Sequence, residues 1–266
     1  MEVKGKKIIV TGGGSGIGRE LVLELLKKGA SVIALDLNKT ALEETTVLAQ
    51  ESKASLSVYE LDISNQQASE ALAEKLISES NIDGVINNAG IIQPFVKFNN
   101  LDYPTIERVM NVNFYGTLYL TKALLPHLLK RPEAHIVNVS SMGGFLPVPG
   151  QTIYGSAKAA VKLFTEGLRS ELMDTKVNVS IVFPGAIGTD IAKNSGLGTL
   201  PGGNQKNSMK TMPAPKAAQE IIKGMEANSY RILVGSDAKF MDFIYRLNPK
   251  FAAKFIYSKM KSLLPE

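Results

Sequence analysis

Short runs of apolar residues alternate along the chain with longer segments in which apolar residues recur every three or four positions. The runs have the length of buried strands, and the periodic segments have the spacing of amphipathic helices. The predicted strands are Lys7–Val10, Ser31–Leu35, Leu56–Leu61, Gly84–Ile86, Ile136–Val139, Val177–Phe183 and Arg231–Val234. The predicted helices are Arg19–Lys28, Asn38–Glu51, Asn65–Glu79, about 105–129, Tyr154–Met173 and Lys216–Met225.

This alternation predicts right-handed crossovers and a mostly parallel sheet that is covered by helices on both faces. The chain has no internal repeat and no linker. We therefore predict an α/β fold, a single-domain, Rossmann-type, doubly wound parallel sheet of about seven strands, over residues 1–235. A C-terminal amphipathic helical extension is predicted over residues 236–266.

The composition excludes several classes of site. The chain has 266 residues and no cysteine, so it has no disulfide, no thiolate nucleophile and no cysteine-based metal site. His127 and His135 have no partner at catalytic spacing, and we interpret both as structural; no metal is expected. There is no signal-peptide segment and no apolar run of the about 18 residues that a membrane span needs. We expect a cytoplasmic protein.

A glycine-rich stretch, Thr11 to Gly18, connects the first strand to the first helix. Glycines allow the backbone to approach a pyrophosphate, and a helix N-terminus presents free N–H groups to it. Asp36 ends the second strand, where a carboxylate accepts hydrogen bonds from ribose hydroxyls and repels a 2′-phosphate, which favours NAD over NADP. The spacing Gly12-x-x-x-Gly16-x-Gly18 differs from Gly-x-Gly-x-x-Gly, so the loop by itself is equally consistent with an ordinary turn. Arg19 is either a phosphate partner or part of an exposed helix face.

Three residues of the stretch 140–158 have the properties of a proton-transfer site. Tyr154 and Lys158 are four apart, so on a helix they project from the same face. An ammonium near a phenol favours the phenolate and lowers its pKa. Ser141 follows a strand, where its hydroxyl could hold a substrate oxygen. The alternative is a tyrosine and a lysine that merely cover a surface. However, the polar and glycine-rich signals all follow strand ends, so they converge on one edge of the sheet.

These motifs, in this order and spacing, resemble the short-chain dehydrogenase/reductase family over roughly residues 4–235. The resemblance implies hydride transfer between a nicotinamide cofactor and a secondary alcohol or ketone. The family's serine lies thirteen residues before its tyrosine, which selects Ser141 over Ser140, and its Asn-x-x-Gly pattern selects Asn113 over Asn111. The implied catalytic residues are Asn113, Ser141, Tyr154 and Lys158. The implied cofactor-binding residues are Gly12, Ser15, Gly16, Ile17, Gly18, Asp36, Asp62, Ile63, Asn87, Ala89, Gly90, Tyr154, Lys158, Pro184, Gly185, Ile187 and Thr189.

Some of these residues have a structural alternative. Asp62, implied at the adenine end with Ile63 packing the ring, is alternatively a helix N-cap. Asn87, Asn88 and Gly90 are expected to bind the central strand to its neighbours, and Asn87 and Gly90 are also expected beside the cofactor. Thr189, implied against the nicotinamide carboxamide, is alternatively a simple cap. Asn113 is implied to order a water that connects Lys158 to solvent.

The substrate is expected to be hydrophobic, such as a fatty, steroid-like or other lipophilic carbonyl compound. Residues Ile191 to Pro215 have no sustained period and resemble a lid, and further apolar residues precede it. They are Ile92, Pro94, Phe95, Phe145, Leu146 and Val148. Two alternatives stay open: a non-catalytic NAD-binding regulator, and a reductase of a small polar hydroxy acid or sugar.

In the C-terminal extension the sequence pattern predicts two short amphipathic helices separated at Pro249. Its apolar residues recur at steps of three and four, with basic residues between them. Residues 237–266 hold six cations and three anions, so they contribute +3 to the net charge of +5. The extension is expected to dock on the domain or a sister subunit, or alternatively on an anionic membrane surface. No nucleic-acid partner is expected, and the resemblance implies a homodimer or homotetramer.

Overall fold

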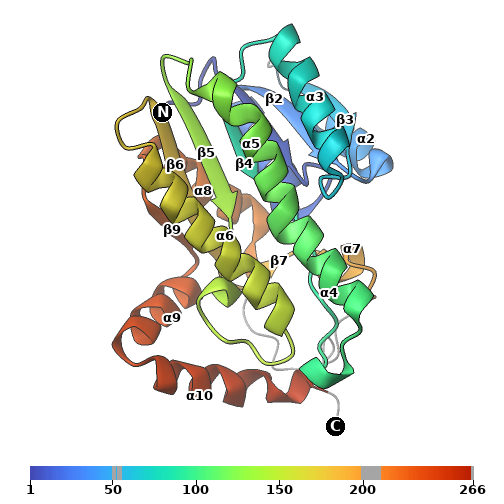
Figure 1. Cartoon of the computed structure of the whole chain (residues 1–266), viewed down its shortest axis with the longest axis vertical. Coiled ribbons are helices and arrows are strands. Elements are labelled where there is room, and N and C mark those ends of the chain that lie inside the picture. Colours follow the sequence, from blue (N-terminus) through green and yellow to red (C-terminus); the bar gives the residue numbers. More distant parts are fainter. Residues whose placement is uncertain (50–51, 53–55, 199–210, 265–266) are drawn as a thin grey trace.

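The centre of the protein is a seven-stranded parallel sheet with the order β3-β2-β1-β4-β5-β6-β9 (Figure 1). The computed structural model describes residues 1–49, 52, 56–198 and 211–264. Every pairing in this sheet is parallel, as predicted. The strands are β1 (Lys7–Thr11), β2 (Ser31–Asp36), β3 (Leu56–Glu60), β4 (Gly84–Asn87), β5 (Ala134–Val139), β6 (Val177–Pro184) and β9 (Arg231–Val234). Their bounds lie within two residues of those predicted.

Helices cover both faces of the sheet, because successive residues of each strand point to opposite sides. In β1, Ile8 and Val10 join one core cluster with the apolar residues of α1 (Gly16–Lys27), α2 (Lys39–Leu48) and α8 (Ala214–Glu226). Ile9 joins a second cluster with those of α3 (Gln66–Glu79), α5 (Gly116–Leu128) and α6 (Thr152–Glu171). The doubly wound prediction is therefore confirmed.

The predicted long helix over about 105–129 contains a change of helix type. It consists of α4 (Tyr103–Met110), a π-helical turn η2 (Asn111–Tyr115) and α5. Such single π turns occur frequently at functional sites. This turn contains Asn113, whose side chain is fully buried.

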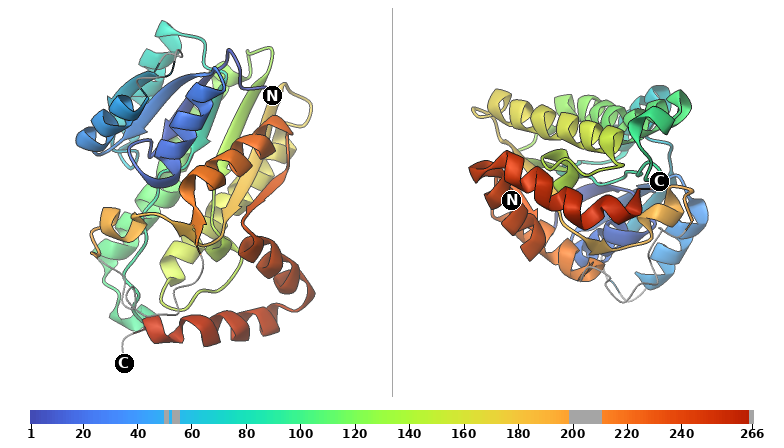
Figure 2. Two further views of the ribbon diagram at one scale, coloured as in Figure 1. Left: turned by 180° about the vertical axis from the view of Figure 1, so that it is seen from behind. Right: turned by 90° about the horizontal axis from the view of Figure 1, so that it is seen from below.

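The C-terminal extension forms two helices, α9 (Ser236–Leu247) and α10 (Pro249–Met260), which meet at Asn248. Asn248 caps α10 by accepting a hydrogen bond from the Phe251 N–H at 2.9 Å. The inner face of the pair packs on the segment that follows β5, in a third core cluster centred on Leu146, Met241, Ala252 and Ile256. Figure 2 shows the pair closing one end of the molecule. The prediction of two helices separated at Pro249 is confirmed, and within the described residues no helix has the length and apolarity of a bilayer span.

Both histidines contact residues of the fold rather than the predicted site. His127 Nε2 lies 3.1 Å from the Ile82 nitrogen. His135 is fully buried, and its Nε2 lies 2.9 Å from Ser180 Oγ. Since Ser180 donates its own proton to the Ser229 carbonyl, His135 is the donor in that pair.

We predict that His135 makes the protein less stable in mild acid. Burial lowers its pKa from 6.5 to about 3. Between these two values the unfolded chain binds the extra proton, so the free energy of unfolding falls as the pH falls, by at most about 1.4 kcal/mol per pH unit. Chemical denaturation of the parent protein and of His135→Gln at pH 7 and at pH 5 measures this. Between pH 7 and pH 5 the free energy of unfolding of the variant should fall by about 1–2 kcal/mol less than that of the parent. Equal losses would contradict it.

Candidate active site

The glycine loop between β1 and α1 is shaped for a close approach of backbone to a ligand. A side chain at Gly18 would collide with the Gly12 carbonyl and with Asn88 Nδ2, so only glycine fits there. Ser15 is the N-cap residue of α1, and its side chain makes no capping hydrogen bond. The first-turn N–H groups are therefore not occupied by a side-chain acceptor, which fits the anion-binding role predicted for a dinucleotide pyrophosphate.

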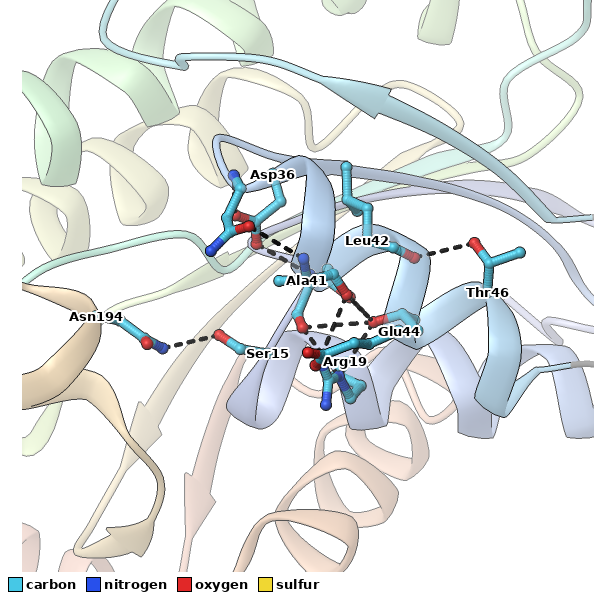
Figure 3. A network of polar contacts seen from close by, with 12 residues as sticks. Ser15, Arg19, Asp36, Ala41, Leu42, Glu44, Thr46 and Asn194 are labelled. Atoms are coloured by element: carbon cyan, nitrogen blue, oxygen red, sulfur yellow. Dashed lines mark hydrogen bonds and ion pairs between the residues drawn. The ribbon is translucent and has the colours of Figure 1, made fainter.

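Asp36 lies at the end of β2 and is bonded to the glycine loop. Its carboxylate accepts hydrogen bonds from the Gly14 N–H and the Asn38 N–H, both at 2.9 Å. The Arg19 guanidinium donates to the Gly14 carbonyl at 2.9 Å and pairs with Glu44 at 2.6 Å (Figure 3). Arg19 thus holds α2 against the loop. Its side chain is 21% exposed, so the alternative of an exposed helix face is wrong, and the role of phosphate partner stays a prediction.

The segment after β6 closes on the glycine loop from the other side. Asn194, in the short helix α7 (Ile191–Asn194), donates to Ser15 Oγ at 2.9 Å (Figure 3). The next residue, Ser195, accepts a hydrogen bond from the Ile92 N–H at 3.0 Å. A Cβ at Gly16 would lie 3.3 Å from Thr189. The beginning of the predicted lid is therefore ordered into a helix, and its positions 199–210 lie outside the described residues.

The hydroxyls of Ser141 and Tyr154 meet beside Gly143. A Cβ at Gly143 would lie 3.6 Å from both Ser141 Oγ and the Tyr154 ring. Burial raises the pKa of Tyr154, and the hydrogen bond with Ser141 opposes that shift. The net direction is opposite to the lowering that the Tyr154–Lys158 spacing predicts. The reason is that desolvation of the phenolate is the larger effect.

Lys158 is buried below Tyr154, one turn further along α6. Its Nζ lies 6.0 Å from the centre of the Tyr154 ring and donates to the Val139 carbonyl at 3.0 Å. Burial lowers the pKa of Lys158 to about 8. An ammonium has three donors, so two remain for a ligand or water. The predicted shared face of Tyr154 and Lys158 is therefore present, whereas a surface role is excluded for Lys158.

Asn113 and Gly90 complete this side of the site. Asn113 Nδ2 donates to the Ile91 and Val109 carbonyls, each at 2.9 Å. A Cβ at Gly90 would lie 2.6 Å from Asn113 Oδ1 and 3.1 Å from Lys158 Nζ. Gly90 thus allows the π turn and α6 to approach the loop after β4.

Asn87, the last residue of β4, and Asn88, which follows it, bind strands together. Asn87 Nδ2 donates to Thr121 Oγ1 at 2.9 Å and to Asn138 Oδ1 at 2.8 Å, inside the core. Asn88 Nδ2 donates to the Thr11 carbonyl, and the Ala89 N–H donates to Thr11 Oγ1. The strand-binding role is confirmed. Both donors of the Asn87 amide are used within the core, so a cofactor contact from them is not available.

The predicted adenine-end residues also have observed contacts. Asp62 accepts from the Ser64 N–H at 2.9 Å, and the N-cap of α3 is Asn65, so the alternative that Asp62 caps this helix is wrong. Ile63 is only 7% exposed and packs on Gly116, so its side chain offers little surface to a ring.

The segment after β6 is bonded to the extension. A side chain at Gly185 would collide with the Asp237 carboxylate. This carboxylate accepts a hydrogen bond from the Ala186 N–H at 2.7 Å. Ile187 packs at the border of the first core cluster. The segment thus runs from the end of β6 to the glycine loop, where Thr189 lies beside Gly16. It contains the predicted residues Pro184, Gly185, Ile187 and Thr189.

Gln93 is a functional residue that the sequence reasoning missed. It is fully buried, and its Oε1 accepts from the Ile153 N–H at 2.8 Å and the Tyr154 N–H at 3.0 Å. Its Nε2 donates to the Gly150 carbonyl at 3.0 Å. Gln151, the N-cap residue of α6, makes no capping bond with its side chain. Gln93 therefore caps α6 from another loop, at the backbone of Tyr154.

We predict that Gln93→Leu lowers kcat about tenfold or more, because the Tyr154 N–H loses its acceptor. Gln93→Glu keeps an acceptor for both N–H groups beside a helix N-terminus and should recover part of kcat. Steady-state kinetics of both variants check this. Gln151→Leu is the matched comparison and should lose less kcat, because the buried Gln151 side chain donates to the Gln93 carbonyl and makes no capping bond to α6. A cofactor dissociation constant that rises in parallel with the loss of kcat would contradict a positioning role.

Of the residues predicted to form an apolar substrate pocket, Leu146 is part of the core instead, and Phe145 is partly buried against the core. Leu146 is 1% exposed, in the cluster under α9 and α10. The Phe145 ring packs between Phe183 and Tyr245, with ring centres 5.4 and 6.0 Å away. The extension, whose docking the sequence left open, covers both.

The comparisons with known proteins agree with this arrangement. A family model described as short chain dehydrogenase matches residues 6–198. A putative oxidoreductase, SadH from Mycobacterium tuberculosis, is 35% identical over 255 residues, which cover 92% of this chain and 91% of that protein. A short chain dehydrogenase/reductase from Burkholderia phymatum in complex with NAD has a TM-score of 0.81 at 23% identity, covering 93% and 96% of the two chains. One from Burkholderia cenocepacia in complex with NADP has a TM-score of 0.79 at 24% identity, covering 98% and 99%.

Proposed function

Because this chain belongs to the short-chain dehydrogenase/reductase family of NAD(P)-dependent oxidoreductases that act on CH–OH groups, we propose that it interconverts a lipophilic secondary alcohol and its ketone with NAD. One observation supports this proposal above the others. The Ser141 hydroxyl and the Tyr154 ring both lie beside Gly143, and Lys158 and Asn113 both lie beside Gly90. Both groups lie at the sheet edge that carries the glycine loop.

In this proposal Ser141 and Tyr154 hold the substrate oxygen. Burial raises the pKa of Tyr154, so the phenol is protonated at neutral pH and is ready to give its proton to a carbonyl oxygen. Lys158 donates one N–H to the Val139 carbonyl and has two further donors. With these it would return a proton to Tyr154 through water and would bind the nicotinamide ribose. The nicotinamide, when bound, supplies or accepts the hydride. Asn113 holds the backbone of the π turn in place for this relay.

The preference for NAD is part of the proposal and depends on Asp36. Its carboxylate is held in place by two backbone N–H groups, so it cannot easily turn away from a 2′-phosphate. We predict that Asp36→Ala lowers kcat/KM with NADH about tenfold and narrows the NADH/NADPH ratio by at least as much, because it removes a hydrogen-bond acceptor and a repulsive charge. Initial rates with both cofactors measure this. An unchanged ratio would contradict the role.

The experiment that tests the function is a panel of alcohols and ketones, graded from small polar hydroxy acids to bulky lipophilic ketones. Turnover is followed by NADH and NADPH absorbance separately. We expect activity to rise with the apolar size of the substrate. A preference for small hydroxy acids or sugars would favour the alternative substrate class. Tight NADH binding without turnover of any panel member would favour the NAD-binding regulator.

We also propose a homodimer or homotetramer, formed through the face of α4, α5 and α6. Exposed apolar side chains on or next to these helices support the idea: Tyr103 in α4, Leu163 in α6 and Met173 just after α6 are each at least 70% exposed. Burial of such a surface against a second copy is favourable. Light scattering measures the mass of the assembly.

A further inference from the structure

The two helices of the extension expose a row of large apolar side chains, here named the aromatic face. Its members are Phe240, Phe243, Leu247 and Phe251, which are 52–68% exposed. The first three are spaced by three and four residues, so they share one side of α9. Phe255 connects the two helices, because its ring centre lies 6.4 Å from the rings of both Phe240 and Phe251. The aromatic face is therefore one continuous surface.

The aromatic face is not needed to hold the extension on the domain. The opposite side of α9 and α10 does that, through Met241, Ala252 and Ile256. A large exposed apolar surface in a folded chain usually marks a site of interaction with another surface. The chemistry of the partner has to be read from the charges around it.

These charges are almost all positive. The extension exposes six cations, namely Lys239, Arg246, Lys250, Lys254, Lys259 and Lys261. Its two acids within the described residues are engaged inside the protein. Asp237 accepts from the Ala186 N–H, and Asp242 is buried and pairs with Arg231 at 2.6 Å and Arg246 at 3.0 Å. The exposed charged side chains in the described part of the extension are thus all cations, and one of them, Lys259, lies 5.7 Å from the centre of the Phe255 ring.

This combination fits an anionic phospholipid surface. Aromatic and leucine side chains enter the boundary between headgroups and acyl chains, while lysines remain at the anionic headgroups. A second copy fits less well. In a twofold dimer the same surface meets itself, so the six cations of one chain would face those of the other.

The position of the extension gives such a contact a use. Figures 1 and 2 show α10 lying across the end of the molecule to which the carboxyl ends of the strands point. The inner side of the extension packs on Met142, Phe145 and Leu146, between the two catalytic hydroxyl residues Ser141 and Tyr154 in the sequence. A membrane under α10 would lie next to the substrate side of the site.

We propose that the aromatic face binds the surface of an anionic phospholipid bilayer, as a peripheral contact without insertion of a spanning helix. The proposal concerns binding, and it stands whether or not the oxidoreductase substrate is the one proposed above.

The test is co-sedimentation of the full chain with two kinds of vesicle, phosphatidylcholine alone and phosphatidylcholine with about 30% phosphatidylglycerol. We expect at least about tenfold tighter binding to the anionic vesicles, weakening as salt is raised. The double variants Phe243→Ser/Leu247→Ser and Lys250→Glu/Lys254→Glu should each lose about tenfold or more. These side chains are exposed, so circular dichroism should show an unchanged fold.

Val47→Ser/Leu48→Ser is the matched control, because it removes similarly exposed apolar side chains, 61% and 57% exposed, from α2, outside the extension and outside the proposed oligomer face. It should bind vesicles as the parent does. The proposal is overturned if the parent does not sediment with anionic vesicles, or if the two face variants bind as well as the control. It is also overturned if the two variants of the aromatic face change the mass of the assembly in light scattering and leave vesicle binding unchanged. That result would assign the aromatic face to contact with a second copy.

Discussion

Tyr154→Phe is expected to lower kcat by about 100- to 10,000-fold, the range that a positioned general acid contributes. The substitution removes one oxygen from a half-buried ring beside Ser141 and leaves the packing of α6 unchanged. NADH binding, followed by the fluorescence of the bound cofactor, should therefore remain within about twofold of the parent, because the lost interaction is made with the reacting oxygen. Single-turnover measurements would place the loss in the chemical step.

The control for this variant is Tyr103→Phe, which removes the same oxygen from a side chain that is 80% exposed. Its turnover should equal that of the parent. Unchanged turnover of Tyr154→Phe would remove the acid–base role. A large loss of NADH affinity without a loss of kcat would instead make Tyr154 a cofactor-binding residue only.

Gly90→Ala is expected to abolish most activity, because the new methyl group would displace the neighbouring side chains of Asn113 and Lys158. The new methyl would lie 2.6 Å from Asn113 Oδ1 and 3.1 Å from Lys158 Nζ. Asn113 is held by two backbone carbonyls and Lys158 by a third, so neither can withdraw without losing a buried hydrogen bond. We expect kcat to fall about 100-fold or more, with about 1–3 kcal/mol lost from the free energy of unfolding.

Gly167→Ala is the matched control, because Gly167 lies in α6 with open space where the methyl would be. This substitution should raise the free energy of unfolding by up to about 1 kcal/mol, since alanine favours a helix over glycine, and should leave kcat unchanged. Denaturant unfolding and steady-state kinetics of both variants give the comparison. Full activity in Gly90→Ala would show that the loop after β4 can relax, and that the close packing around Lys158 is not required for turnover.

The sheet, its strand positions and the meeting of Ser141, Tyr154 and Lys158 could be predicted from the sequence for a local reason. Strand and helix periods are visible in short windows, and parallel strands bring the residues after them to one edge. Tyr154 and Lys158 are four residues apart on one helix, so their shared face follows from the helix itself.

Gln93 could not be predicted in the same way. Its importance comes from two backbone N–H groups about sixty residues away, and backbone donors leave no mark in the amino-acid sequence. The shift in the Tyr154 pKa was predicted in the wrong direction for a related reason. The spacing to Lys158 is a property of the helix, whereas the burial that raises the pKa depends on everything packed around the ring.

The extension was predicted as two amphipathic helices, but the surface beneath them was not. The spacing of its apolar residues predicts that one side of the helices is buried. It does not predict which loop that side covers. The sequence therefore predicts Leu146 in a substrate pocket, although it is buried under α9 and α10. Residues that are apolar and close to a site in sequence serve equally well as pocket lining or as core.

The hydrogen bond from the Ala186 N–H to Asp237 has a consequence for how the chain can be shortened. A truncated protein that stops after β9 would lose the acceptor of that partly buried amide and would open the surface beside Gly185. Loss of turnover in such a fragment would then report damage to the wall of the site, whatever the two helices do outside it. Point substitutions on their outward side keep that anchor, and only they can separate the two effects.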